Sequence, residues 1–335
     1  MSRKLDFSRK RKSLRNKRIL MGVLSLVVLF VIGFGATVLI SEMNKDNPSG
    51  GLFTTIKNKI FLSDNSSNQN LQGDKQQEEE QKEPEPPKPL PTDLVEGSNT
   101  SIEGSEYVFS GFDAQLATKY KLEQDGKKIA FLTFDDGPSE NTPEILDILK
   151  EKDVKATFFV WAKTLYGKEE IREYLKRELK EGHAIGNHSY SHDYNLLYPG
   201  RKANLQNILE DFDKANNKFK EVLGEDFETR VIRFPGGAMS WKEMDAAKKA
   251  FEEKGIAYVD WNIDSTDAKS NKRTKEQILK AITEELESLE ANNVEKITIL
   301  MHDAATKKST VEALPEIIDL LKSKGYEFRT LSTDK

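Results

Sequence analysis

From residue 128 onward, apolar and polar positions follow two alternating patterns. Short apolar runs without polar interruptions are typical of strands that are buried on both faces of a parallel sheet. Longer stretches place apolar residues three or four positions apart, which predicts amphipathic helices. Strands are predicted at 129–134, 156–160, 184–186, 231–234, 257–260, 296–301 and 327–331. Helices are predicted around 145–149, at 169–180 and 201–223, and around 241–251, 278–289 and 311–321.

This alternation predicts an α/β fold. About seven βα units occupy roughly 205 residues, which is fewer than the eight units and about 250 residues of a regular (β/α) barrel. Two architectures fit such a chain, a distorted (β/α) barrel and a doubly wound sheet. We expect the distorted barrel, because turns containing His, Pro and Gly follow several different strands and a barrel gathers such turns on one rim.

The N-terminal part of the chain differs from the rest in charge and hydropathy. Residues 1–18 hold nine Lys and Arg and one acid, a charge of +8. Since the whole chain has a net charge of −5, the remaining residues carry −13. An acidic body argues against nucleic acid as the main partner. Ile19–Ile40 then provides 22 uncharged, mostly apolar residues, enough to span a membrane as a helix. We expect a single uncleaved transmembrane signal anchor rather than a cleaved signal peptide, with residues 1–18 in the cytoplasm and everything after Ser41 outside the cell.

Residues 41–105 are rich in Asn, Ser, Gln, Glu, Lys and Pro, and they predict a disordered extracellular linker. Residues 106–127 are interpreted as a lead-in segment, either strand or helix, that packs against the domain of residues 128–335. The chain contains no cysteine, which excludes disulfides, a thiolate nucleophile and a cysteine-bound metal.

The first predicted strand of the domain ends in two adjacent carboxylates, Asp135 and Asp136, followed by a Gly-Pro turn. In a parallel α/β fold, such a strand delivers its acids to the face where active sites lie. Seen alone, the pair is more often an ordinary acidic turn.

Three of the four histidines also follow predicted strands. His188 and His192 are four residues apart, so one helical turn would place both rings on the same side. Two imidazoles and a carboxylate are a common set of transition-metal ligands, and with open positions they fit a hydrolytic zinc site. A zincin is excluded, because Ser189 occupies the position of its glutamate base. His183 lies near the start of its strand, where we expect a structural core histidine.

Two further strands end in polar turns that contain Arg233 and His302. Together with the Asp and His pairs, these turns make the sequence resemble the polysaccharide deacetylases, also called carbohydrate esterase family 4 or the NodB-homology domain. Four ordered family motifs are intact: T-F-D-D-G at Thr133–Gly137, H-[ST]-x-x-H at His188–His192, R-x-P-[GY]-G at Arg233–Gly237 and L-x-H at Leu300–His302. A further family motif, D-x-x-D-W, ends in Ala268 instead of Trp, so either Trp261 covers the gap or the groove is wider.

The resemblance implies a metal-dependent hydrolase that removes acetyl groups from N-acetylated sugars by cleaving linear amide C–N bonds. On the family pattern, Asp136, His188 and His192 would hold a divalent metal, usually Zn²⁺. The metal would polarise the acetyl carbonyl and lower the pKa of its bound water.

The same pattern implies roles for five further residues. Asp135 would be the general base, held by charge-assisted hydrogen bonds from Arg233. The backbone N–H of Gly236 would help to stabilise the oxyanion. His302 would protonate the leaving amine, and Asp267 would orient and tune its imidazole.

An anchored domain on a flexible linker meets the cell wall first, so we expect peptidoglycan as the substrate, at its N-acetylglucosamine residues. Deacetylation of N-acetylmuramic acid or of an exopolysaccharide is the alternative within the family. From other classes, a catalytically silent glycan-binding module and an iron oxygenase with two His and one carboxylate remain to be distinguished. The intact pair of Asp135 and His302 argues against the silent module, which needs neither a base nor an acid.

Overall fold

The computed structural model describes residues 94–333. The predicted basic segment 1–18, the signal anchor 19–40 and the linker up to residue 93 lie outside the described residues. Within residues 94–333, no helix combines the length and the apolar character that crossing a membrane requires.

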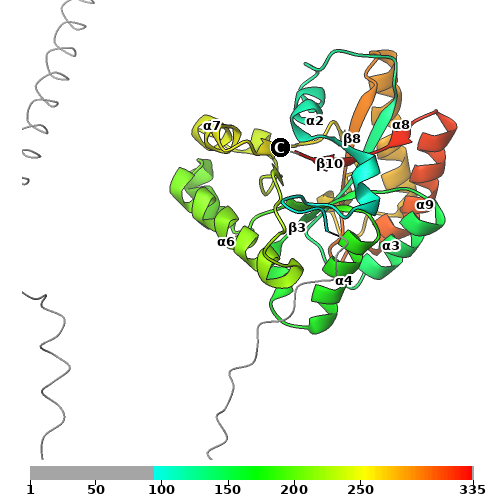
Figure 1. The fold of residues 1–335 in the computed structure, drawn as a ribbon. Helices are drawn as coiled ribbons and strands as arrows, with labels where there is room; N and C mark the ends of the chain where they lie inside the picture. The colour runs from blue at the N-terminus through cyan, green and yellow to red at the C-terminus, as the bar shows by residue number, and fades with distance from the viewer. Residues whose placement is uncertain (1–93, 334–335) are drawn as a thin grey trace, which may run out of the picture. The chain divides into compact units, whose positions relative to one another are not determined.

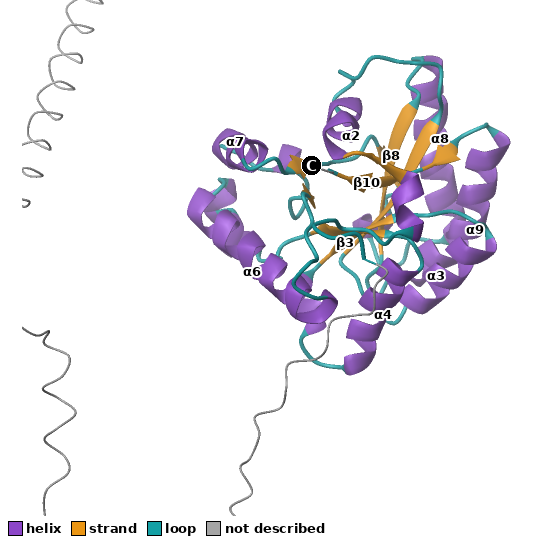
Figure 2. Ribbon diagram, in the orientation of Figure 1, coloured by secondary structure: helices purple, strands orange, loops and turns teal. Residues whose placement is uncertain are grey.

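A curled sheet of parallel strands forms the centre of the domain, with helices arranged around it (Figure 1). The strands follow the order β6-β5-β4-β3-β2-β8-β7, and β9 also pairs with β2. Figure 2 shows the strands in orange among the purple helices. The strands are β2 (Ile129–Asp135), β3 (Thr157–Val160), β4 (Ala184–Asn187), β5 (Val231–Ile232), β6 (Ala257–Tyr258), β7 (Ile263–Asp264), β8 (Lys296–His302) and β9 (Glu327–Phe328). The predicted α/β fold with a curled parallel sheet is therefore confirmed.

The two ends of this sheet, β6 and β7, belong to one nearly continuous stretch of chain. The N–H of Val259, just after β6, donates to the carbonyl of Ile232 in β5, at 2.9 Å, and the N–H of Asn262 donates to the carbonyl of Thr298 in β8, at 3.1 Å. Between these two bonds the backbone leaves β5 and joins β8. Among the described strands, β6 and β7 do not pair with each other, so the distortion of the predicted barrel takes the form of an open half-barrel.

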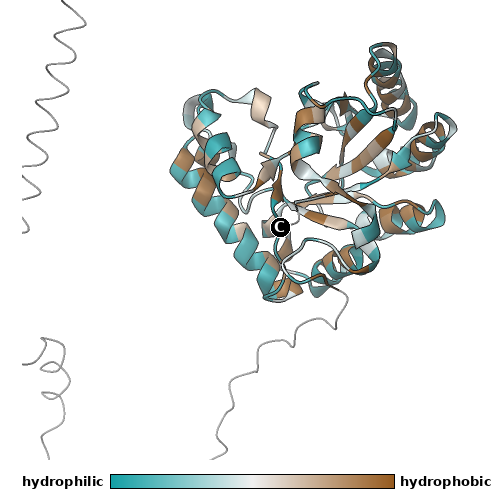
Figure 3. Cartoon of the chain, turned by 45° about the horizontal axis from the view of Figure 1, so that its top comes forward, coloured by the Kyte–Doolittle hydropathy of each residue, from teal (hydrophilic) through white to brown (hydrophobic). Residues whose placement is uncertain are grey.

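Helices cover the outer face of the sheet, and their hydrophilic sides point away from the strands (Figure 3). They are α3 (Thr142–Glu151), α4 (Glu169–Lys180), α5 (Tyr194–Leu197), α6 (Leu205–Leu223), α7 (Asp245–Glu253), α8 (Lys275–Ala291) and α9 (Lys308–Ser323). The largest apolar cluster lies between the strands and α3, α4, α8 and α9. A second cluster joins α6 and α7 to β5, and a third fills the inside of the curled sheet around Phe131 and Phe159.

Element boundaries differ from the predicted ones where local chemistry ends an apolar pattern. Helix α6 begins at Leu205 and not at residue 201, because the Asn204 side chain accepts a hydrogen bond from the N–H of Asn207 and caps the helix there. Trp241 precedes α7 and stacks on Tyr198, with ring centroids 4.2 Å apart. The predicted strand 327–331 is two strands, β9 and β10 (Thr330–Ser332).

Residues 94–105, assigned to the end of the disordered linker by their composition, instead fold onto the domain. The Asn99 amide group donates to the carbonyls of Ile185 and Leu331, at 3.0 Å each, which ties this segment to two distant strands. The lead-in segment that follows contains both predicted kinds of element, β1 (Val108–Ser110), which pairs with β10, and α2 (Gly111–Thr118). The folded domain thus begins no later than residue 94.

Candidate active site

The carboxyl ends of the parallel strands bring the polar turns of the sequence to one edge of the sheet. In the register of β2 and β8, Asp135 lies directly opposite His302. His188 follows β4, and Arg233 follows β5, which is the next strand in the sheet. This arrangement gathers the predicted site residues because neighbouring parallel strands end on the same side.

Asp136, His188 and His192 form a cluster whose possible ligand atoms all lie within 4.8 Å of one another. The Nε2 atoms of His188 and His192 lie 3.6 and 3.3 Å from Oδ1 of Asp136. His188 donates from Nδ1 to the carbonyl of Arg233 at 2.8 Å, which leaves Nε2 with the lone pair that a metal needs. Burial lowers the pKa of His188 to about 3, so the ring is neutral, as a ligand must be.

The same cluster contains an unsatisfied group that a cation would satisfy. Oδ1 of Asp136 is buried and has no hydrogen-bond partner among the described residues. Such an orphaned carboxylate oxygen is costly unless an ion or a proton meets it. The donor set of one carboxylate and two imidazoles therefore fits a divalent transition metal.

The two histidines meet through a turn and not through the helical turn predicted from their spacing. Ser189 and His192 have φ angles of 72° and 51°, in the left-handed region. The side chain of Ser189 accepts a hydrogen bond from the N–H of His192 at 3.1 Å, which stabilises this turn. The ring centroids of His188 and His192 are 5.0 Å apart as a result. Asp136 also has a positive φ of 72°, so the backbone turns sharply at two of the three possible ligands.

Asp135 is fixed by a fully buried arginine. Arg233 donates from Nη1 to Oδ1 of Asp135 at 2.7 Å and to the hydroxyl of Thr133 at 2.8 Å. Its other donors reach the carbonyls of Val259 and Asp260, at 2.8 and 3.1 Å. Burial raises the pKa of Asp135 above its usual range, and the charge of Arg233 only partly opposes this. A carboxylate in this state accepts a proton more readily than an exposed one.

His302 is held by Asp267 in a second buried pair. Nδ1 of His302 lies 2.7 Å from Oδ1 of Asp267, and Oδ2 of Asp267 accepts from the His302 backbone N–H at 2.9 Å and from the Thr310 hydroxyl at 2.8 Å. Burial alone would lower the pKa of His302, but the hydrogen bond and charge of Asp267 outweigh it and raise the pKa to about 9. The imidazole is therefore protonated at neutral pH and can donate a proton.

The loop after Arg233 exposes a backbone donor beside these groups. Gly236 and Gly237 have φ angles of 76° and 78°. A Cβ atom on Gly237 would come within 2.6 Å of the Trp261 ring, so a side chain cannot be accommodated there. Within the described part of the chain, the N–H of Gly236 donates to no carbonyl or side chain.

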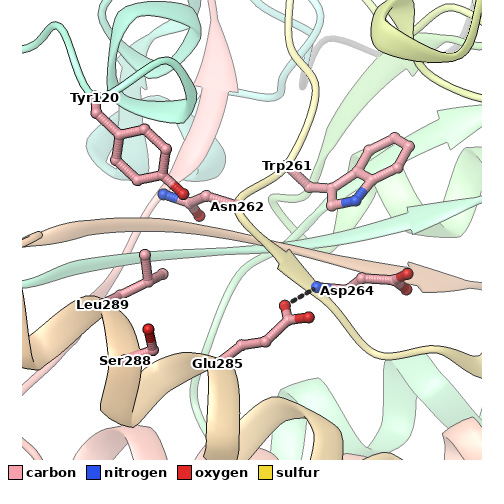
Figure 4. A pocket seen from close by; sticks show the side chains of 7 residues that line it. All are labelled: Tyr120, Trp261, Asn262, Asp264, Glu285, Ser288 and Leu289. Carbon is pink, nitrogen blue, oxygen red and sulfur yellow. Dashed lines mark hydrogen bonds between the residues drawn. The ribbon is translucent and has the colours of Figure 1, made fainter.

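Trp261, one of the two explanations offered for the missing aromatic residue at position 268, contacts the Gly236 loop and Arg233. Its ring packs at Gly237 and lies 5.6 Å from the Arg233 guanidinium. Ala268 is exposed beside the buried Asp267. Trp261 also borders a cavity of about 390 Å³ that opens between β7, α8 and the end of α2 (Figure 4). There the Glu285 carboxylate accepts from the N–H of Asp264 at 2.6 Å.

Three further residues of the site region were not singled out from the sequence. Asp303 is buried, and it accepts hydrogen bonds from the hydroxyls of Ser139 and Thr142, at 3.3 and 2.5 Å. Burial raises its pKa to about 8. Tyr194 and Trp241 lie beside His192 and Gly236. Of these three residues, only Asp303 could have been noticed in the sequence, because it is a carboxylate directly after His302. His183 is a core residue as expected, with Nδ1 accepting from the Ala156 N–H at 3.1 Å.

Comparisons with known proteins agree with this geometry. The family described as polysaccharide deacetylase matches residues 123–259. The putative polysaccharide deacetylase YheN of Bacillus subtilis is 38% identical over 218 residues, which cover 64% of this chain and 70% of YheN. A peptidoglycan-N-acetylglucosamine deacetylase of Bacillus cereus is 33% identical over 202 residues, covering 60% of this chain and 68% of the relative. The structure of a Streptococcus mutans CE4 esterase matches with a TM-score of 0.65 and 36% identity, covering 72% of this chain and all of that one (100%).

Proposed function

Because the chain belongs to the polysaccharide deacetylase family, we propose that it removes N-acetyl groups from the N-acetylglucosamine residues of peptidoglycan with a bound divalent metal ion. The observation that carries this proposal is a carboxylate and an imidazole on adjacent strands, each with a raised pKa. The pKa of Asp135 is raised, as suits a base, and the pKa of His302 is raised to about 9, as suits an acid. A protein that only binds glycans requires neither.

We assign the metal site to Asp136, His188 and His192. Zn²⁺ is the best match, since two imidazoles and one carboxylate with open positions are typical of hydrolytic zinc sites. When bound, the ion supplies Lewis-acid polarisation of the acetyl carbonyl and makes a water molecule more acidic. The neutral state of His188 and the orphaned oxygen of Asp136 support this assignment.

The chain's own residues then move two protons. Asp135 accepts a proton from the attacking water, and Arg233 keeps the carboxylate in place during this transfer. The N–H of Gly236, which has no partner among the described residues, donates to the acyl oxygen as negative charge develops there. His302 donates its proton to the amide nitrogen, because an amine leaves poorly as an anion, and Asp267 holds the resulting imidazole in orientation.

The choice of peptidoglycan rests on the relatives and on the N-terminal sequence. The Bacillus cereus relative is named for peptidoglycan N-acetylglucosamine. We also propose that residues 19–40 anchor the chain in the cell membrane, with the N-terminus inside and the enzyme outside, because a basic block precedes 22 uncharged residues. Membrane fractionation followed by external protease tests this topology. A soluble mature form that begins near residue 42, as the only product, would contradict it.

The test of the activity is acetate release by the full-length protein from chito-oligosaccharides and from purified peptidoglycan, with the modified sugar identified by mass spectrometry. We expect glucosamine in place of N-acetylglucosamine, loss of activity on chelation and recovery with Zn²⁺. Acetate release only from N-acetylmuramic acid residues, or only from an exopolysaccharide, would show that this sugar and not N-acetylglucosamine is the substrate. Absence of acetate release by the metal-loaded protein from every glycan would reject the enzymatic function, and a requirement for oxygen would indicate an iron oxygenase.

A further inference from the structure

Tyr194 lies between the metal cluster and the Gly236 loop. It is the first residue of α5, two positions after His192, and its ring centroid is 5.3 Å from that of His192. On the other side, its ring meets Trp241 in an edge contact at 4.9 Å. The side chain is 43% exposed, so the aromatic contacts leave part of it open to a ligand.

The hydroxyl of Tyr194 is directed at Gly236. A Cβ atom placed on Gly236 would lie 3.3 Å from the Tyr194 hydroxyl oxygen. Within the part of the chain that the structure describes, nothing hydrogen-bonds to this hydroxyl. The Gly236 N–H lacks a partner in the same part of the chain. Two unused donors from segments far apart in sequence thus stand beside one another.

One acceptor can satisfy both donors. A backbone nitrogen is about 2.5 Å from the Cβ position of its own residue, so the Tyr194 oxygen and the Gly236 nitrogen are at most about 5.8 Å apart. An oxygen atom that accepts two hydrogen bonds of about 2.9 Å spans that separation. In an amide substrate, the acyl oxygen is the acceptor whose negative charge grows during hydrolysis.

A purely structural role explains the ring of Tyr194 but not its hydroxyl. Tyr198 belongs to the same aromatic group and stacks on Trp241, yet it is 2% exposed, and its hydroxyl is buried away from any donor or acceptor among the described residues. Tyr198 therefore fills space. Tyr194 instead presents its polar end to the open side of the site.

We propose that Tyr194 is a further catalytic residue, whose hydroxyl donates a hydrogen bond to the acyl oxygen of the substrate next to the Gly236 N–H. This assignment rests on the proposed amide hydrolysis. It adds a side-chain donor, contributed by the segment that follows His192, to the backbone donor of the Gly236 loop.

The test compares Tyr194→Phe with Tyr198→Phe in the full-length, metal-loaded protein. Each variant loses one hydroxyl from the same aromatic group, so the second controls for the general effect of the change. We expect Tyr194→Phe to lower kcat for acetate release by about 10- to 100-fold with KM within about twofold, because one oxyanion donor is lost. Tyr198→Phe should retain the wild-type kcat and KM.

Two measurements separate this role from others. Metal content by elemental analysis should equal that of the wild type in both variants. A methylphosphonamide analogue of the N-acetyl sugar, which imitates the tetrahedral state, should bind Tyr194→Phe more weakly by about the same factor as the loss in kcat. An unchanged kcat, or a rise in KM alone, in Tyr194→Phe would overturn the assignment. Failure of the proposed function would appear differently, as a wild-type protein that releases no acetate.

Discussion

Substitution of Asp267 by Asn should remove the proton from His302 at the pH where the enzyme works. In the wild type the pKa of His302 is about 9, against an ordinary value of 6.5. This difference of about 2.5 units corresponds to roughly 3.4 kcal/mol in favour of the imidazolium. Burial acts in the opposite direction, and the hydrogen bond and charge of Asp267 are the largest of the effects that raise the pKa, ahead of the charges of Asp135 and Asp136. Asn keeps the shape but carries no charge. With its oxygen toward the His302 backbone N–H and the Thr310 hydroxyl, its NH₂ group faces Nδ1 of His302, which then has no hydrogen-bond acceptor there for its proton.

We therefore expect the pKa of His302 in Asp267→Asn to fall to 6.5 or below. At pH 8 the protonated fraction would drop from about nine-tenths to about one-thirtieth, a loss of about 30-fold in the active form. A bound divalent cation offsets the pull of Asp135 and Asp136 on His302, so both values shift downward in the loaded enzyme. The difference between wild type and variant should persist.

The assay is the pH dependence of kcat/KM for acetate release, whose basic limb reports the acid. This limb should move toward acid pH by about two units in Asp267→Asn. The chain has only four histidines, so the imidazole proton signals can also be titrated directly by NMR, with His302→Ala to identify the relevant one. Glu285→Gln, which alters a carboxylate bonded to the N–H of Asp264, is the matched control and should leave the limb in place. A basic limb and an imidazole pKa that are both unchanged in Asp267→Asn would refute the reasoning.

Three further predictions concern the opposite side of the site and its surroundings. Asp136→Ala should lose metal, measured by elemental analysis, whereas Asp135→Asn should retain it and lose about 10²- to 10⁴-fold in rate, as expected for a missing base; the reverse pattern would exchange the two assignments. If position 268 lines the pocket, Ala268→Trp should narrow the range of acyl groups released, with metal content unchanged, and identical selectivity would show that the position does not line the pocket. Asp303 has a pKa of about 8 in the folded state, so the folded protein binds its proton more tightly than the unfolded chain and loses stability as pH rises from about 4 to 8. Asp303→Asn should flatten this decline in denaturant titrations, and an equally steep decline would argue that Asp303 is ionised.

The strands and the polar turns could be predicted from the sequence because each has a local signal. An apolar run such as 129–134 identifies a buried strand, and the residues that follow it must lie at its carboxyl end. Parallel pairing then places Asp135 beside His302 without further information. These parts of the candidate site depend on strand order alone.

The parts that escaped prediction depend on contacts between distant segments. Strand β7 has only two residues, one of them Asp264, and it exists because β8 offers a free edge. The turn that joins His188 to His192 requires positive φ angles at Ser189 and His192, which spacing cannot reveal. Tyr194 reaches Gly236 only after β4 and β5 pair, so no motif contains both. The order in residues 94–105 likewise depends on Asn99 meeting two carbonyls far away in the chain.

The backbone stretch from β6 to Asp267 holds the partners of both Asp135 and His302, the proposed base and acid. At its start, the carbonyls of Val259 and Asp260 hold Arg233 and thereby Asp135. At its end, Asp267 holds His302. A single inserted residue within 261–264 would lengthen this stretch by about 3.3 Å and turn the following side chains to the opposite face of the sheet. A change in length here would move the partners of Asp135 and His302 apart. Relatives that vary in length should therefore place their insertions after Lys269, in the exposed turn before α8.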